Sequence, residues 1–303
     1  MADKISNLIL LLVLVIISGC QIQQPVDNAV LSKTHASPFD NTIAFSRLTG
    51  DYWQVWTMQP DGSNLKQVTK SLSDKRYPVW KRDGRELFCR TNNNKAFSVN
   101  PDSGSEHQII PSMALVGGIA SSPIDDKLLL VRFRTQLRDS ASLWLTTLDE
   151  KNSRILTRDT GLQYDPAWSY DGEKIAYILG HGYQTHELYI MDCTGKNKRK
   201  LTNNKALEVL PAFSPDGKTI AYASDITGDF EIWLMNVYGS NCRQLTNSKG
   251  LDTRPYWSPD GNKIMFVSNR SGKLQIWIMN NDGSNPEQLT TGAASIDPAW
   301  RRE

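Results

Sequence analysis

A tandem repeat constrains the fold of this chain more than any other feature of its sequence. The segment that begins at Pro211 reads PAFSPDGKTIAYAS, and the segment that begins at Pro255 reads PYWSPDGNKIMFVS. A further copy begins at Pro166 with PAWSYDGEKIAYIL. A repeat of about 40–50 residues is typical of propellers and of other repeat arrays. We therefore expect the chain to build one structural unit several times.

Three series of positions return together and divide the chain into units. The first is an aromatic residue shortly after the proline, at Trp80, Trp168, Phe213, Trp257 and Trp300, with Ser121 and Ala36 at this place in two weaker copies. The second is an aromatic residue in a later apolar run, at Trp56, Phe97, Trp144, Tyr189, Trp233 and Trp277. The third is Leu-Thr or its equivalent, at Val68-Thr69, Ile109-Ile110, Leu156-Thr157, Leu201-Thr202, Leu245-Thr246 and Leu289-Thr290. These series predict six units, at 36–77, 78–119, 120–165, 166–210, 211–254 and 255–297.

Each unit has the pattern of four short strands. A turn, which is Ser-Pro-Asp-Gly at 214–217 and 258–261, separates the first strand from a second that is rich in β-branched and aromatic residues. A four-stranded antiparallel sheet of this size is one propeller blade, and bulky side chains fill the space between blades. The sequence therefore predicts an all-β, six-bladed propeller. The last segment, Pro298–Glu303, repeats only the first strand, so we expect it to complete the first blade and close the ring.

The N-terminus predicts export and lipid attachment. Residues 8–17 form an apolar run that is too short to span a membrane, which takes about 20 residues, and that fits a signal peptide. The Ile17-Ser18-Gly19-Cys20 sequence resembles a bacterial lipobox. We expect residues 1–19 to be a lipoprotein signal peptide, Cys20 to be acylated, residues 20–35 to be a tether and residues 36–303 to be the propeller. The alternative is an ordinary secretory signal.

The charge of the chain excludes one class of partner, and its cysteines indicate little disulfide bonding. The net charge is +2 and no basic run with interleaved aromatic residues occurs, so no nucleic-acid partner is expected. Cys89 is expected in the core, and a disulfide between Cys193 and Cys242 stays open. We expect a monomer.

The repeat resembles that of the TolB family of bacterial envelope propellers. The resemblance rests on P-x-W-S-P-D-G-x-x-I-A-Y, I-W-x-M-N and D-G-S-N-x-x-Q-L-T, and it extends from about Ala36 to Trp300. It implies a six-bladed propeller in the periplasm that binds partners at its channel mouth, notably a peptidoglycan-associated lipoprotein. TolB has an α/β domain before its propeller, whereas here only the tether is expected between Cys20 and the first blade. We therefore expect a stand-alone relative of TolB. Gln21 after the cysteine resembles an outer-membrane sorting signal, which implies the periplasmic face of that membrane.

No catalytic motif is recognisable. The sequence contains no G-x-S-x-G, P-loop, G-x-G-x-x-G or H-E-x-x-H motif, so we expect no enzyme and no cofactor. His181 and His186 are the only histidines close in sequence and are weak candidates for a metal site. Because some propeller lyases that act on pectin fragments hold a metal through histidine, the alternative function is a metal-dependent, oligogalacturonate-type lyase or hydrolase. A purely structural envelope component is the third possibility.

The candidate binding surface lies where each unit enters its first strand. The loops on that side of the repeat vary in sequence, and variable loops on a rigid scaffold commonly carry binding specificity. The residue before each first-strand proline is expected at the channel mouth, at Tyr77, Asp165, Leu210, Arg254 and Asp297. The sequence thus favours a non-catalytic, lipid-anchored propeller scaffold that binds an envelope protein through this mixed polar ring.

Overall fold

The structure, a computed structural model, describes residues 41–110, 116–134, 140–182 and 185–301. The predicted signal peptide, Cys20 and the tether lie outside the described residues. The described ranges form β-strands and turns. No membrane-spanning helix is found in this part of the chain.

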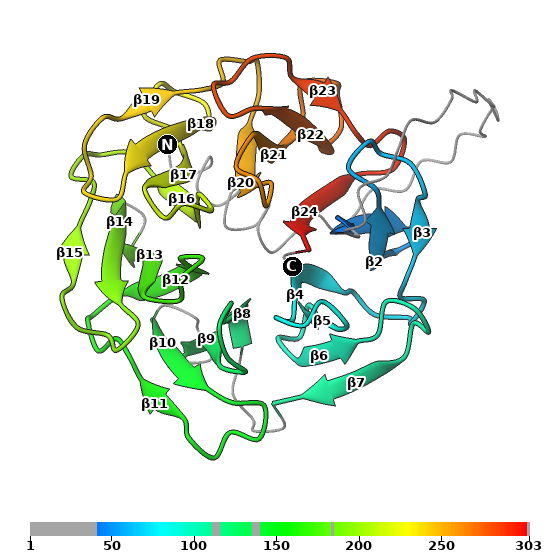
Figure 1. The fold of residues 1–303 in the computed structure, drawn as a ribbon, viewed down its shortest axis with the longest axis horizontal. Helices are drawn as coiled ribbons and strands as arrows, with labels where there is room; N and C mark the ends of the chain where they lie inside the picture. Colours follow the sequence, from blue (N-terminus) through cyan, green and yellow to red (C-terminus); the bar gives the residue numbers. More distant parts are fainter. Residues whose placement is uncertain (1–40, 111–115, 135–139, 183–184, 302–303) are drawn as a thin grey trace. The chain divides into compact units, whose positions relative to one another are not determined.

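Most strands belong to four-stranded antiparallel sheets, which lie around a common centre (Figure 1). The four sheets are β24 (Ser295–Trp300), β1 (Ile43–Thr49), β2 (Tyr52–Met58) and β3 (Lys66–Gln67); β4 (Arg76–Trp80), β5 (Leu87–Arg90), β6 (Ala96–Val99) and β7 (Glu106–Ile109); β16 (Glu208–Phe213), β17 (Thr219–Ser224), β18 (Glu231–Asn236) and β19 (Arg243–Gln244); and β20 (Asp252–Trp257), β21 (Lys263–Ser268), β22 (Gln275–Asn280) and β23 (Glu287–Gln288). The remaining strands form a single sheet of eight, β8 (Val116–Ser121), β9 (Leu128–Phe133), β10 (Ala141–Thr146), β11 (Arg154–Ile155), β12 (Leu162–Trp168), β13 (Lys174–His181), β14 (Thr185–Asp192) and β15 (Arg199–Lys200).

The prediction of six separate four-stranded blades is therefore wrong, because only four such blades are present in the described residues. The third and fourth predicted units share one sheet, in which Ala141 of β10 pairs in parallel with Leu162 of β12. The chain entering β12 runs beside the start of β10, where the Ala141 N–H donates to the Gly161 carbonyl at 3.3 Å. At the next boundary the corresponding contact is one isolated bridge between His186 and Leu207, and β14 and β16 stay in separate sheets. Sequence periodicity does not report such hydrogen bonds between units.

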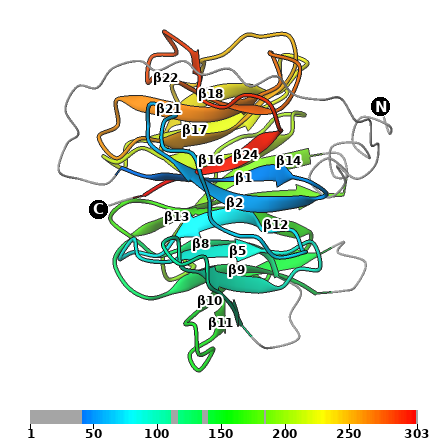
Figure 2. The same ribbon diagram turned by 90° about the vertical axis from the view of Figure 1, so that its right-hand side faces the viewer.

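The innermost strands form a closed ring. β24, β4, β8, β12, β16 and β20 contact one another in that order, and β20 contacts β24 (Figure 1). Closure comes from the C-terminal strand, as the lone first-strand copy predicts. β24 lies beside β1 (Figure 2). In their pairing Trp300 is opposite Ile43 and Ala299 is opposite Ala44. This pairing covers the edge that β1 would otherwise expose.

First-series tryptophans fill the interface with the preceding sheet of strands. Trp80 of β4 packs with Val55 of β2, and Trp300 of β24 packs with Ile278 of β22. Within the eight-stranded sheet, Trp168 of β12 packs against the β9 and β10 strands. These side chains are buried, and each stabilises the fold by about 1.5–3 kcal/mol or more through the apolar surface removed from water.

The recurring threonines bind the last strand of a unit to the third. The Thr246 hydroxyl accepts a hydrogen bond from the Ile232 N–H at 2.9 Å and donates to Glu231 Oε2 at 2.6 Å. The same backbone hydrogen bond recurs at Thr69, Thr157, Thr202 and Thr290. The hydroxyl satisfies a buried backbone donor that would otherwise lack a partner, which explains why threonine follows leucine in most copies.

Candidate functional site

The five predicted channel-mouth residues share an unusual backbone conformation. Their φ angles are all positive, 55° at Tyr77, 49° at Asp165, and 56° at Leu210, Arg254 and Asp297. Positive φ is uncommon outside glycine, and here it coincides with register shifts between each inner strand and its neighbour. A β-bulge of this kind redirects a side chain. The prediction placed these residues at the entry to the strand, whereas the structure places them inside β4, β12, β16, β20 and β24.

Tyr77, Arg254 and Asp297 meet in an ion-paired group, which Arg76 joins. Asp297 Oδ1 lies 2.9 Å from Arg254 Nη1, and Asp297 Oδ2 lies 3.3 Å from Nε of Arg76. The Tyr77 N–H also donates to Oδ2, at 3.3 Å. The Asp297 side chain is only 3% exposed. Burial disfavours its charge, but the guanidinium groups of Arg254 and Arg76 outweigh burial and hold the pKa of Asp297 below its ordinary value.

The Tyr77 ring is surrounded by guanidinium groups. The Cζ atoms of Arg90, Arg76 and Arg254 lie 4.7, 4.8 and 5.1 Å from its centroid. These distances are within the range of cation–π attraction. Burial raises the pKa of the phenol, yet the charges of Arg76 and Arg254 give a net lowering. We refer to Arg76, Tyr77, Arg90, Arg254 and Asp297 as the inner-ring cluster.

Two members of the inner-ring cluster were missed by sequence reasoning. Arg76 and Arg90 are cross-strand partners in β4 and β5, and neither precedes a proline. Pairing β4 with β5 by the repeat pattern would have placed Arg90 opposite the residue before Tyr77. That register was the available signal.

The other two predicted residues behave differently. The Leu210 N–H donates to Oδ2 of Asp165 at 3.1 Å, so the leucine contributes its backbone to the contact. Burial raises the pKa of Asp165 to about 6, against the opposing charge of Arg254. Asp165 therefore changes charge in a pH range where Asp297 stays ionised.

The two candidate metal histidines are not arranged as a pair of ligands. His186 is buried, with Tyr164 Oη at its Nδ1 and the Gly182 carbonyl 3.1 Å from its Nε2. Burial lowers the pKa of His186. His181 pairs with Thr185, one register position away from the pair of Gly180 with His186, so the two imidazoles start on opposite faces of the sheet. Among the described residues no group of three His, Cys, Asp or Glu side chains is placed to hold a metal ion.

The three cysteines of the described ranges are free thiols. Cys193 is half-buried and Cys242 is exposed, so the disulfide that the sequence left open is not formed. Cys89 is fully buried, as expected, and burial raises the pKa of its thiol to about 12.

Together these features define a class: an all-β repeat propeller with a closed inner ring that carries a charged, internally paired cluster. A family model described as the TolB beta propeller domain (PD40) matches residues 125–303. The chain belongs to this family.

Solved structures support the same fold. A protein described as TolB from Agrobacterium tumefaciens is 21% identical, with a TM-score of 0.71 over 84% of this chain and 91% of that one. TolB from Acinetobacter baumannii is 18% identical, with a TM-score of 0.75 over 88% and 68%. An oligogalacturonate lyase in complex with manganese is 14% identical, with a TM-score of 0.59 over 82% and 73%. No curated protein sequence matches the chain.

Proposed function

We propose that the chain is a non-catalytic, protein-binding propeller scaffold of the bacterial cell envelope, and that its partner binds at the inner-ring cluster. The observation that carries this proposal is the buried Asp297, held between arginines that come from two other sheets. The bulged backbones hold the members of the cluster in place before a partner binds. Binding therefore loses little further side-chain entropy at these residues.

The charge of the cluster indicates the chemistry of the partner surface. Its three guanidinium groups face one carboxylate within the cluster, with Asp165 nearby as a second acid. The cluster also has unsatisfied buried donors, because Arg76 Nη2 and Arg90 Nε have no hydrogen-bond partner within the described ranges. An acidic segment of the partner would complement this surplus of positive charge. A peptidoglycan-associated lipoprotein is the partner that we propose to test first.

The proposed location is the periplasmic face of the outer membrane. Family membership supports an envelope role, and Ile17-Ser18-Gly19-Cys20 supports a lipid anchor. Acylation at Cys20 would leave the propeller on a tether of about 16 residues, long enough to reach partners near the membrane.

The competing function is a metal-dependent, oligogalacturonate-type lyase or hydrolase. Its support is the fold shared with the manganese-bound lyase structure. Against it, His186 already uses both ring nitrogens within the protein. An imidazole needs one free nitrogen to bind a metal, so the binding function is favoured.

Two arginines close together in sequence, one inside the inner-ring cluster and one outside it, allow a matched test of the binding site. Arg90 is the last residue of β5 and lies over Tyr77, whereas Arg85 precedes β5 and is exposed. Arg90→Gln should weaken binding of the purified periplasmic part of a peptidoglycan-associated lipoprotein by about tenfold or more in calorimetric titration, because a charge contact is lost. Arg85→Gln should leave the affinity unchanged.

Equal losses from the two variants would show that the inner-ring cluster is not the binding site. If that lipoprotein does not bind, the wild type and both variants are used to capture partners from envelope extract, and the same difference is expected. Cleavage of oligogalacturonate by the wild type with Mn²⁺, abolished by His186→Ala and unaffected by Arg90→Gln, would replace the scaffold with the lyase.

A further inference from the structure

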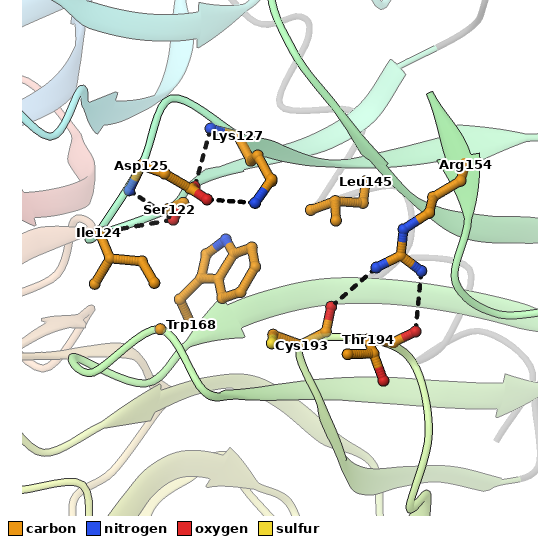
Figure 3. A pocket seen from close by; sticks show the side chains of 10 residues that line it. Ser122, Ile124, Asp125, Lys127, Leu145, Arg154, Trp168, Cys193 and Thr194 are labelled. Atoms are coloured by element: carbon orange, nitrogen blue, oxygen red, sulfur yellow. Dashed lines mark hydrogen bonds and ion pairs between the residues drawn. The ribbon is translucent and has the colours of Figure 1, made fainter. Parts of the chain in front are cut away.

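A cavity of about 320 Å³ lies between the two halves of the eight-stranded sheet (Figure 3). One half comprises β8–β11 and the other β12–β15. Its apolar walls include Ile124, Leu145 and the indole of Trp168. The remaining lining residues are Ser122, Asp125, Lys127, Arg154, Gly172, Cys193 and Thr194. None of these residues belongs to the inner-ring cluster. The volume is sufficient for a small organic ligand, since ligand sites start at about 300 Å³.

The indole of Trp168 provides an unpaired donor in this cavity. At the same position in other sheets, Trp80 Nε1 donates to the Ala299 carbonyl at 3.1 Å and Trp257 Nε1 donates to the Ala212 carbonyl at 3.2 Å. Trp168 is only 5% exposed, and its Nε1 has no hydrogen-bond partner among the described residues. The Nε1 atoms of Trp233, Trp277 and Trp300 also lack a partner there, but none of these residues lines the cavity. A buried N–H without an acceptor costs about 1–3 kcal/mol, which a ligand acceptor would recover.

The short side chain of Cys193 lies in the cavity wall. The residue four positions after the second-series aromatic is Cys193 in this sheet, Val237 in the next and Asn281 in the one after. Val237 is buried in the core, and Asn281 Nδ2 donates to the Gly261 carbonyl at 2.9 Å. Val237 thus packs in the core between two sheets, whereas Asn281 is exposed and bonds within its own sheet.

An arginine holds the two sides of the interface together in all three places. Arg154 donates to the carbonyls of Thr194 and Cys193 at 3.0 and 3.4 Å. Arg199 reaches the Val237 carbonyl at 2.8 Å, and Arg243 reaches that of Asn281 at 3.1 Å. The separation of the two sides is thus maintained while the Cys193 side chain is short, and space remains beside Trp168.

The charged side chains around the cavity carry a net positive charge, because Lys127 and Arg154 outnumber the single carboxylate of Asp125. The Trp168 N–H and the Lys127 ammonium can only donate, and the one carboxylate, that of Asp125, is already paired with Lys127. Figure 3 shows the nitrogen edge of the Trp168 indole on the side of the Ser122–Lys127 turn. A matching ligand has an apolar body and an anionic acceptor group.

We propose that this cavity binds a small organic carboxylate with an aryl or branched-alkyl body. The body lies against Trp168 and Leu145, and the carboxylate accepts from Trp168 Nε1 and faces Lys127. This ligand site is separate from the partner surface proposed above, and either proposal can fail without the other.

Cys193 lies in the cavity wall and can report on occupancy. The test uses the full chain with Cys20→Ser and Cys242→Ser, which leaves Cys193 as the accessible thiol because Cys89 is buried. Benzoate is expected to slow modification of Cys193 by a thiol reagent, with saturation in the millimolar range. Benzamide, which lacks the charge, should protect about tenfold more weakly.

Trp168→Phe keeps an aromatic wall and removes the N–H, so it should lower the affinity for benzoate about tenfold. A thermal melt confirms that this variant folds. Independently of it, the indole ¹H–¹⁵N resonance of Trp168 in the parent chain should shift with benzoate along the same saturation curve. Absence of protection and of any shift, equal protection by benzamide, or unchanged affinity in Trp168→Phe would overturn the proposal.

Discussion

Asp165 and Asp297 lie at equivalent positions of two innermost strands, but their pKa values are displaced in opposite directions because their neighbours differ. Asp297 contacts two guanidinium groups, which lower its pKa despite burial. Asp165 accepts a backbone hydrogen bond, and burial raises its pKa to about 6. Two carboxyl groups on equivalent bulges can therefore carry different charges at the same pH.

This difference predicts the stability of Asp165→Asn. The folded-state pKa of Asp165 lies above its unfolded value, so ionisation costs stability; the cost is absent below about pH 4 and complete above about pH 6. Asparagine removes the charge and keeps an acceptor for the Leu210 N–H. We expect urea unfolding to give equal free energies for variant and wild type near pH 4, and about 1–2 kcal/mol in favour of the variant at pH 7.5.

Asp102→Asn changes an exposed carboxyl and serves as the control, with little effect at either pH. A stabilisation by Asp165→Asn that is the same at both pH values would contradict the assigned titration.

The sequence located part of the inner ring but not its contacts. The recurring residue-before-proline pattern identified Tyr77, Asp165 and Asp297 as equivalent positions, and the structure places them in equivalent strands. Their ion pairs depend on the rotation of one sheet relative to the next, which a repeat pattern does not encode. Arg76 and Arg90 also have no counterpart with the same charge in the other units, so periodicity could not mark them.

At the scale of elements, the repeat predicted strands and turns well and hydrogen bonding between units poorly. The aromatic series correctly indicated which side chains fill the interfaces, since burial requires large apolar residues at fixed register. The merging of the third and fourth units into one sheet rests on the local path of Gly161 and Leu162 beside Ala141. The cavity next to Trp168 is likewise lined by residues that are far apart in sequence, such as Ile124, Leu145 and Cys193, and that meet only in three dimensions.

The role of β24 predicts the effect of a short C-terminal deletion. Removing Pro298–Glu303 eliminates Trp300 from its interface and the Ala299 carbonyl that accepts from Trp80 Nε1. Loss of a buried tryptophan costs about 3–5 kcal/mol, against a total stability of about 5–15 kcal/mol. Calorimetry should show a markedly lower melting temperature for the whole domain.

Deletion of residues 302–303 alone leaves β24 intact and is the matched control, which should melt like the wild type. If the longer deletion also melts at the wild-type temperature, β24 does not stabilise the ring.

For the whole molecule, the N-terminal sequence predicts attachment to a membrane. Cys20→Ser removes the acylation site, so the protein should move from the membrane fraction to the soluble periplasmic fraction. Mass spectrometry of the wild type should show a chain that starts at an acylated Cys20. Cys242→Ser is the control and should stay with membranes. A Cys20→Ser protein that still sediments with membranes after a high-salt wash would rule out the anchor.

The pairing of β1 with β24 also sets the order of events during biosynthesis. β1 leaves the ribosome almost a full chain length before its partner strand, and until then its edge is a template for non-native pairing. Domains normally fold as they emerge, but here ring closure has to wait until β24 has been translated. If the chain is exported, as its N-terminal sequence predicts, this delay keeps the propeller open while the earlier strands cross the membrane.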